Sequence, residues 1–103
     1  MKELKVLLQE CITLTDEIYN AALIEDRNQI RSKSAQLIHR LNDSFPIIIE
    51  AGLKISPVIL ERTEKLLGAT EVGDSIGTMD IVRFEIKSIL EEYLESIGET
   101  FEW

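Results

Sequence analysis

The apolar residues of this chain recur at spacings of three and four, which places side chains on one face of an α-helix. The pattern is most regular in residues 3–23, where a wheel of about 100° per residue puts the apolar residues on one side. That side carries Leu4, Leu7, Leu8, Cys11, Leu14, Thr15, Ile18 and Ala22. No stretch alternates apolar and polar residues between turn residues, so we predict no β-strand.

A second helical pattern begins near Glu25 and Asp26, which are acidic residues suited to a helix N-terminus. Pro46 lies within this pattern. Because proline lacks an amide donor and clashes with the preceding turn, we expect the helix to be kinked or broken near Pro46. The apolar stripe keeps its phase across Pro46, which favours a kinked helix over a loop. The stripe consists of Ile30, Ser34, Leu37, Leu41, Phe45, Ile48 and Gly52.

A third helix has clear boundary signals. Ser56 can cap its first turn, and Pro57 suits the first helical position. Gly68 is placed to end it in the left-handed conformation, and residues 68–73 are predicted to form a loop. The residues expected to point inward are Ile55, Ile59, Thr63 and Leu66.

Asp74 can cap a fourth helix that runs to about Ile97, just before Gly98. Its predicted inward stripe consists of Ile76, Met79, Val82, Ile86, Ile89, Leu90, Tyr93 and Ile97. Four amphipathic helices with short connections predict an all-α antiparallel four-helix bundle. A chain of 103 residues fits one domain, spanning residues 1–103. Phe101 and Trp103 would either fold back on this bundle or fray.

The charge balance disfavours nucleic acid and anionic lipid as partners. With 11 basic and 19 acidic side chains, the net charge is −8, whereas phosphate contacts need Lys and Arg. Residues 1–60 hold 7 basic and 8 acidic side chains, and residues 61–103 hold 4 and 11, so the halves carry −1 and −7. This acidic C-terminal half suits either solubility or a basic partner.

The cellular location is expected to be the cytoplasm. One cysteine cannot form an internal disulfide, so nothing indicates an oxidising compartment. The start of the sequence does not resemble a signal peptide. Apolar runs do not exceed four residues, which is too short to span a membrane.

The sequence offers little to support catalysis, and we expect no enzyme, cofactor or metal. The only histidine, His39, lies opposite the apolar stripe of its helix, and Cys11 lies within the core stripe. No Gly-rich phosphate loop is present. Two acidic pairs have a spacing that could bind Mg²⁺ in an all-helical nucleotide pyrophosphohydrolase, but on the wheel both point away from the core. These pairs are Glu61 with Glu64 and Glu92 with Glu95.

A basic cluster lies on the second helix. A face that pairs its charges with another helix is favoured here over a nucleic-acid patch. The cluster consists of Arg27, Arg31, Lys33 and Arg40.

The fourth helix carries an anomaly that points to a docking site. On the wheel, Ile81 and Phe84 lie opposite the core stripe and are flanked by the small residues Gly77 and Ser88. Large apolar residues beside small ones on an acidic face indicate a binding surface for a partner helix or a second copy of the chain. The alternative is that another helix covers this face, or that the wheel has the wrong phase.

Residues 73–93 resemble the last helix of a group of small uncharacterised helical proteins from Gram-positive bacteria. The residues that match are Asp80, Phe84, Glu85, Ile86, Leu90, Glu91 and Tyr93. The resemblance covers about a fifth of the chain and implies a helical bundle without an established activity. In size and bundle form the chain is also similar to flagellar and secretion export chaperones, a likeness of architecture only.

The sequence therefore predicts a non-enzymatic cytoplasmic protein that binds another protein through its last helix, as an adaptor or export-type chaperone. The binding residues would be Gly77, Ile81, Phe84 and Ser88. The partner would be a protein with basic character or a second copy of the chain. Two alternatives stay open, namely an acidic immunity-type inhibitor of a basic toxin and the Mg²⁺-dependent nucleotide hydrolase.

Overall fold

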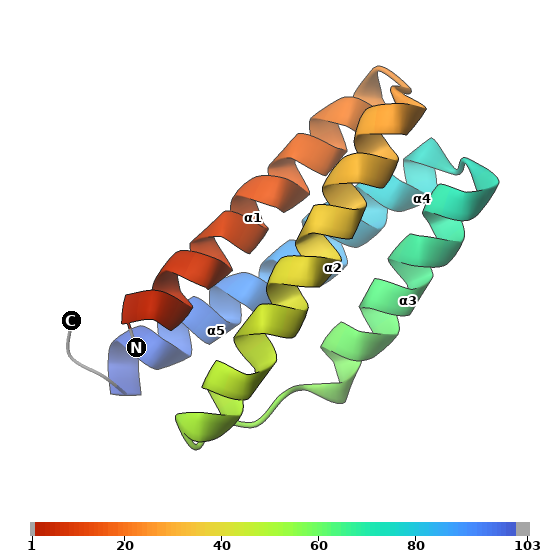
Figure 1. Cartoon of the computed structure of the whole chain (residues 1–103). Helices are drawn as coiled ribbons and strands as arrows, with labels where there is room; N and C mark the ends of the chain where they lie inside the picture. The colour runs from red at the N-terminus through yellow and green to blue at the C-terminus, as the bar shows by residue number, and fades with distance from the viewer. Residues whose placement is uncertain (1, 101–103) are drawn as a thin grey trace.

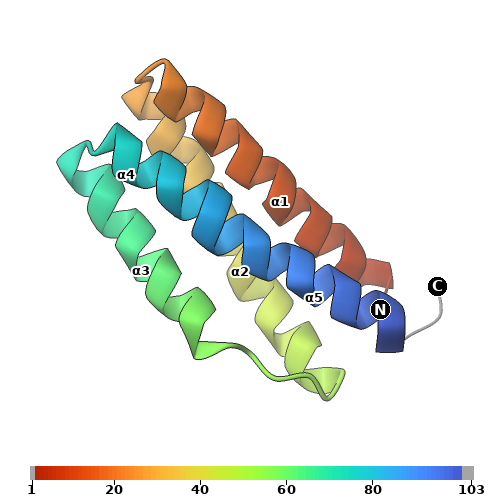
Figure 2. The same ribbon diagram turned by 180° about the vertical axis from the view of Figure 1, so that it is seen from behind.

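The protein is a bundle of helices that lie side by side, as the computed structural model shows (Figures 1 and 2). It describes residues 2–100, and the side chains of residues 3–97. No strand occurs in this range, which confirms the all-helical prediction. Phe101 and Trp103 lie outside the described residues. The elements are α1 (Lys2–Leu23), α2 (Arg27–Glu50), α3 (Pro57–Val72), α4 (Ser75–Asp80), the π-helix η1 (Ile81–Ile86) and α5 (Lys87–Thr100).

The core is built largely on the predicted face of α1. Cys11 and Thr15 are buried there, as the wheel indicated, whereas Leu7 is only half-buried. The α1 stripe packs against α2 and against the last helical segment, which lies on its other side (Figure 2). The largest fully buried side chains are Leu4, Leu8, Ile18, Leu37, Ile48, Ile59, Leu66, Ile86, Leu90, Ile97, Val82 and Thr15.

Helix α2 begins with a side-chain cap and passes through its proline. The Asp26 carboxylate accepts a hydrogen bond from the Gln29 amide at 3.2 Å. The helix then continues without a break to Glu50, so Pro46 does not end it. Pro46 and Asn42 both lie on the exposed side, where water can satisfy the carbonyl that proline leaves without a donor. Because the helix ends at Glu50, Gly52 lies in the following turn with a φ of 78°.

The connection from α2 to α3 is held by a tyrosine of α5. Tyr93 Oη accepts a hydrogen bond from the Ser56 amide at 2.7 Å and donates to the Lys54 carbonyl at 3.4 Å. The predicted cap of α3 is present, since Ser56 Oγ accepts from the Val58 amide at 3.2 Å and Pro57 begins the helix. The start of α3 is therefore tied to α5.

Replacing Tyr93 with phenylalanine is expected to lower the free energy of unfolding by about 1–2 kcal/mol, because the half-buried Ser56 amide loses its acceptor. Urea titration followed by circular dichroism measures this change. Thr70→Val is the control, because it removes an exposed hydroxyl bond within α3 and should cost less. Equal losses for the two variants would contradict the anchoring role of Tyr93.

The predicted end of α3 at Gly68, with a loop over residues 68–73, is wrong. The helix continues to Val72, and Gly73 adopts the left-handed conformation with a φ of 73°. The additional turn places Ala69 against the core, where its carbonyl also accepts the Asp74 amide. Burial of Ala69 gives the longer helix its advantage over a loop that begins at Gly68.

Candidate protein-interaction surfaces

The four residues predicted to bind a partner do not share one surface. Phe84 is 67% exposed, and Ser88 is exposed on the same helical segment. Gly77 is half-buried beside its cap, Asp74. Ile81 is only 8% exposed and belongs to the core, so its predicted position opposite the core is wrong.

The π-helical turn explains the error at Ile81. The helical wheel assumed a uniform α-helix, but η1 inserts a wider turn whose hydrogen bonds run over five residues, as from the Lys87 amide to the Val82 carbonyl. In this wider turn, residues four apart and residues five apart both lie on one side of the helix, which brings Ile81 to the same side as Ile86. Both Ile81 and its neighbour Val82 are consequently buried.

The π turn also aligns a long exposed row on the last helical segment. In a regular α-helix, residues four apart drift by about 40° per step, but the wider turn reduces this drift. Ile76, which the sequence predicted to point inward, is 71% exposed in this row. We call the row the last-helix stripe; it consists of Ile76, Asp80, Phe84, Ser88, Glu91 and Glu95.

The last-helix stripe has a net negative charge. Within the described part of the chain, Asp80, Glu91 and Glu95 form no ion pair. The basic residues of this segment are directed elsewhere, because Lys87 Nζ contacts Asp16 of α1 at 2.9 Å and the Arg83 guanidinium lies 3.8 Å from the centre of the Tyr19 ring. The exposed Phe84 ring therefore sits among carboxylates that no neighbouring cation neutralises.

Glu85 lies on the side of the same segment that faces α3, whereas Arg83 and Lys87 face α1. Its carboxylate contacts Arg62 of α3 at 2.8 Å, and the Lys65 ammonium lies at 4.0 Å. The η1 segment is thus held by ion pairs and a ring contact on both sides, through Glu85 toward α3 and through Arg83 toward α1. These contacts fix the direction in which Phe84 points.

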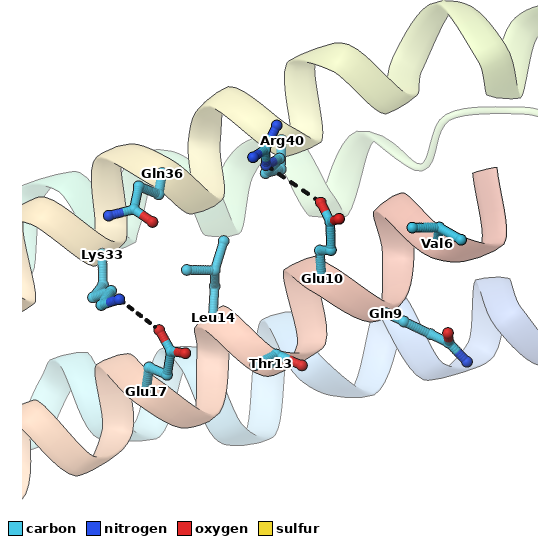
Figure 3. Close-up of a pocket in the computed structure, with 9 residues that line it drawn as sticks. All are labelled: Val6, Gln9, Glu10, Thr13, Leu14, Glu17, Lys33, Gln36 and Arg40. Atoms are coloured by element: carbon cyan, nitrogen blue, oxygen red, sulfur yellow. Dashed lines mark ion pairs between the residues drawn. The ribbon is translucent and has the colours of Figure 1, made fainter. Parts of the chain in front are cut away.

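A groove between α1 and α2, with a volume of 380 Å³, is spanned by two ion pairs that link the helices (Figure 3). Lys33 faces Glu17 at 2.9 Å, and Arg40 faces Glu10 at 3.4 Å. These contacts confirm that two members of the basic cluster pair with another helix. Arg27 and Arg31 form no ion pair within the described residues.

A second apolar surface, which the sequence reasoning missed, lies between α2 and α3. A groove of 270 Å³ separates the two helices there, with Leu41 and Thr63 among its lining residues. We call the surrounding surface the α2–α3 face. The only sequence signal was that α3 carries large apolar residues all round. Ile38, Phe45 and Leu60 line the groove. By helical spacing, the exposed Ile49, four residues after Phe45, and the exposed Leu67, seven after Leu60, extend the face.

The candidate catalytic groups of the sequence are not assembled into a site. His39 is exposed, with its Nε2 atom 3.7 Å from Asp43. Burial raises the pKa of the Cys11 thiol to about 12, so Cys11 is a poor nucleophile near neutral pH. No cluster of three or more metal-ligating side chains is found among the described residues. The four carboxylates proposed for Mg²⁺ are all exposed: Glu61, Glu64, Glu92 and Glu95.

Comparisons of the chain with protein-family models, curated proteins and solved structures found no significant match. Among the described helices, none combines the length and the apolar character needed to cross a membrane.

Proposed function

We propose that this protein is a non-enzymatic interaction module that binds another protein through the last-helix stripe, as an adaptor or an export-type chaperone. The observation that carries the proposal is the exposed Phe84 ring within a row of unpaired carboxylates. An aromatic side chain in water contributes no packing energy to its own fold, whereas on burial in an interface it becomes a strong anchor. The cytoplasmic location expected from the single cysteine belongs to the same proposal.

The chemistry of the stripe favours a basic amphipathic helix as the bound segment. Its apolar residues, Ile76 and Phe84, lie eight positions apart, about two helical turns. A partner helix with apolar residues at a similar spacing could cover both, while its Lys or Arg residues face Asp80 and Glu91. A nucleic acid would bring phosphates against these carboxylates and is disfavoured for that reason.

The arrangement of the helices is part of the proposal. We infer that successive helices run in opposite directions and that α2 bends at Pro46, which makes the fold an antiparallel four-helix bundle. Short turns at residues 24–26 and 73–74 support the alternation, and the proline within α2 supports the bend. The last-helix stripe would then lie along one long side of the bundle.

Phe84→Asp is expected to weaken partner binding at least tenfold, because the aromatic anchor is replaced by a further negative charge. Affinity capture from the source cells, followed by mass spectrometry, identifies the partner. Titration of the purified partner at two salt concentrations then measures the affinity. Glu91→Lys combined with Glu95→Lys should also weaken binding and should reduce its dependence on salt.

Val6→Asp is the matched control, since it replaces an exposed apolar residue on α1, away from the last-helix stripe. This variant should bind as the wild type does. If Phe84→Asp keeps its helical circular dichroism and captures the same partner with unchanged affinity, the proposed docking surface is wrong.

A further inference from the structure

Helix α3 is only partly used by the bundle. Of its six large aliphatic side chains, Ile59 and Leu66 are buried, whereas Val58, Leu60, Leu67 and Val72 are exposed. A helix that is apolar on both sides normally has both sides covered. The outer side of α3 therefore lacks the cover that its sequence predicts.

The exposed side of α3 forms one continuous surface with α2. On α2, Ile38 and Phe45 lie seven residues apart, so they share a face. On α3, Leu60 and Leu67 have the same spacing. Ile38 and Phe45 line the groove together with Leu60, so the two rows lie side by side over a shared hollow.

The α2 row that contains Ile38 and the α3 row that contains Leu60 carry opposite charges at the same end of the bundle. Arg31 precedes Ile38 by seven residues on α2, and Glu71 follows Glu64 by seven on α3. The neighbouring residues Ile30 and Thr70 line one small cavity, which places Arg31 and Glu71 at a similar height. Neither charge forms an ion pair within the described part of the chain.

We propose that a second copy of the chain covers the α2–α3 face, related by a two-fold axis parallel to the helices. In this arrangement α2 of each copy packs on α3 of the other, at the same height. Arg31 then faces the partner's Glu71, and the pair occurs twice because the interface is isologous. Ile38 and Phe45 cover the partner's Leu60 and Leu67, which fills the groove.

A second copy fits this face better than the basic segment proposed for the last-helix stripe. A basic partner would meet the unpaired Arg31, whereas an acidic one would meet Glu64 and Glu71. A partner with both signs in matching positions pairs with Arg31 and with Glu71, and the chain itself has that pattern. This proposal concerns a different surface and does not depend on the proposed function.

The size of the face is compatible with a stable dimer. From residue 31 to residue 49, α2 is about 27 Å long, and two packed helices are about 20 Å wide. The footprint of about 540 Å² underestimates the accessible area of its protruding side chains. It therefore approaches the roughly 800 Å² per partner of a standard interface.

Sedimentation velocity over a concentration series tests the proposal on the full chain, with helicity checked by circular dichroism. The wild type is expected to sediment as a dimer at micromolar concentration. Leu60→Glu combined with Leu67→Glu should weaken dimerisation at least a hundredfold, because four charges enter the apolar centre of the interface. Val6→Glu, at a residue with similar exposure on α1, should leave the dimer intact.

A charge exchange tests the orientation of the two copies. Arg31→Glu alone and Glu71→Arg alone should each weaken the dimer about tenfold, since each variant places like charges opposite one another twice. The double variant should return to within about threefold of the wild-type dissociation constant. Failure of the double variant to recover would overturn the two-fold arrangement.

The outcomes separate this proposal from the proposed function. Phe84→Asp should lose the partner but remain dimeric, and the double leucine variant should lose the dimer but keep a binding-competent last-helix stripe. A wild-type chain that stays monomeric up to high micromolar concentration overturns the dimer. So does a dimer that the leucine variant leaves unchanged, because its interface must lie elsewhere.

Discussion

Replacing Ile81 with aspartate is expected to destabilise the protein by at least about 4 kcal/mol, whereas the same change at Phe84 should alter stability by less than about 1 kcal/mol. Ile81 lies in the core beside Val82 and Ile86, so a carboxylate there would be buried without a partner. Phe84 is exposed, and its replacement leaves the packing of the bundle intact. Urea titration followed by circular dichroism gives both values.

Ile81→Val controls for the site itself, because it removes one methylene group without adding charge. It should cost about 0.5–1.5 kcal/mol. Since native domains are stable by only about 5–15 kcal/mol, Ile81→Asp should lose a large share of the free energy of unfolding. Wild-type stability of Ile81→Asp would mean that this residue faces water and that the π turn is absent.

The Cys11 thiol is expected to react with a thiol reagent at pH 8 about a thousandfold more slowly in the folded protein than in urea. The thiolate is the reactive form. Burial raises the pKa of Cys11 from 9.0 to about 12, with smaller contributions from the charge of Glu10 and, in the opposite direction, of Arg40. That difference in pKa lowers the thiolate fraction at pH 8 by about three orders of magnitude. A colorimetric thiol assay follows the rate.

The same pKa shift predicts a loss of stability in alkaline solution. The folded state favours the neutral thiol of Cys11, so this contribution is fully present below pH 9 and is lost as the pH rises toward 12. The free energy of unfolding should fall by up to about 1.4 kcal/mol per pH unit in that interval. Other groups also titrate there, so the difference between the wild type and Cys11→Ala isolates the thiol. Parallel pH profiles of the two proteins would contradict the prediction.

Local signals predicted the elements well because each acts over a few residues. The caps at Asp26, Ser56 and Asp74 are present as hydrogen bonds to amides two or three residues later. The apolar spacing of α1 correctly indicated that Cys11 is buried, and the wheel of α2 correctly placed His39 on the outside. Neither prediction required knowledge of the neighbouring helices.

The end of α3 shows where local signals become ambiguous. Gly68 and Gly73 can both terminate a helix, and propensity alone does not choose between them. A Cβ atom at Gly68 would meet nothing within 4 Å, so this glycine has no tight contact that requires it. Packing of Ala69 against the core makes the extra turn favourable, and that contact exists only in the folded bundle.

The candidate surfaces also differ in whether local sequence signals or tertiary packing reveals them. Exposed Phe84 and its acidic neighbours could be found on the wheel, but the wheel wrongly placed Ile81 beside Phe84, because Ile81 is buried in the structure. The α2–α3 face depends on how closely two helices approach, and the sequence of either helix alone does not specify this.

The sequence by itself determined that the chain forms helices, where most of them begin, and that its excess negative charge gathers after residue 60. Only the tertiary structure decided which side chains of the last helical segment face the core. A uniform helix cannot keep Thr78, Val82, Ile86 and Leu90, each four residues from the next, on one buried side, because that spacing drifts by about 40° per step. Burial of these residues against α1 and α3 stabilises the wider π turn, which places Ile81 in the core and leaves Phe84 in water.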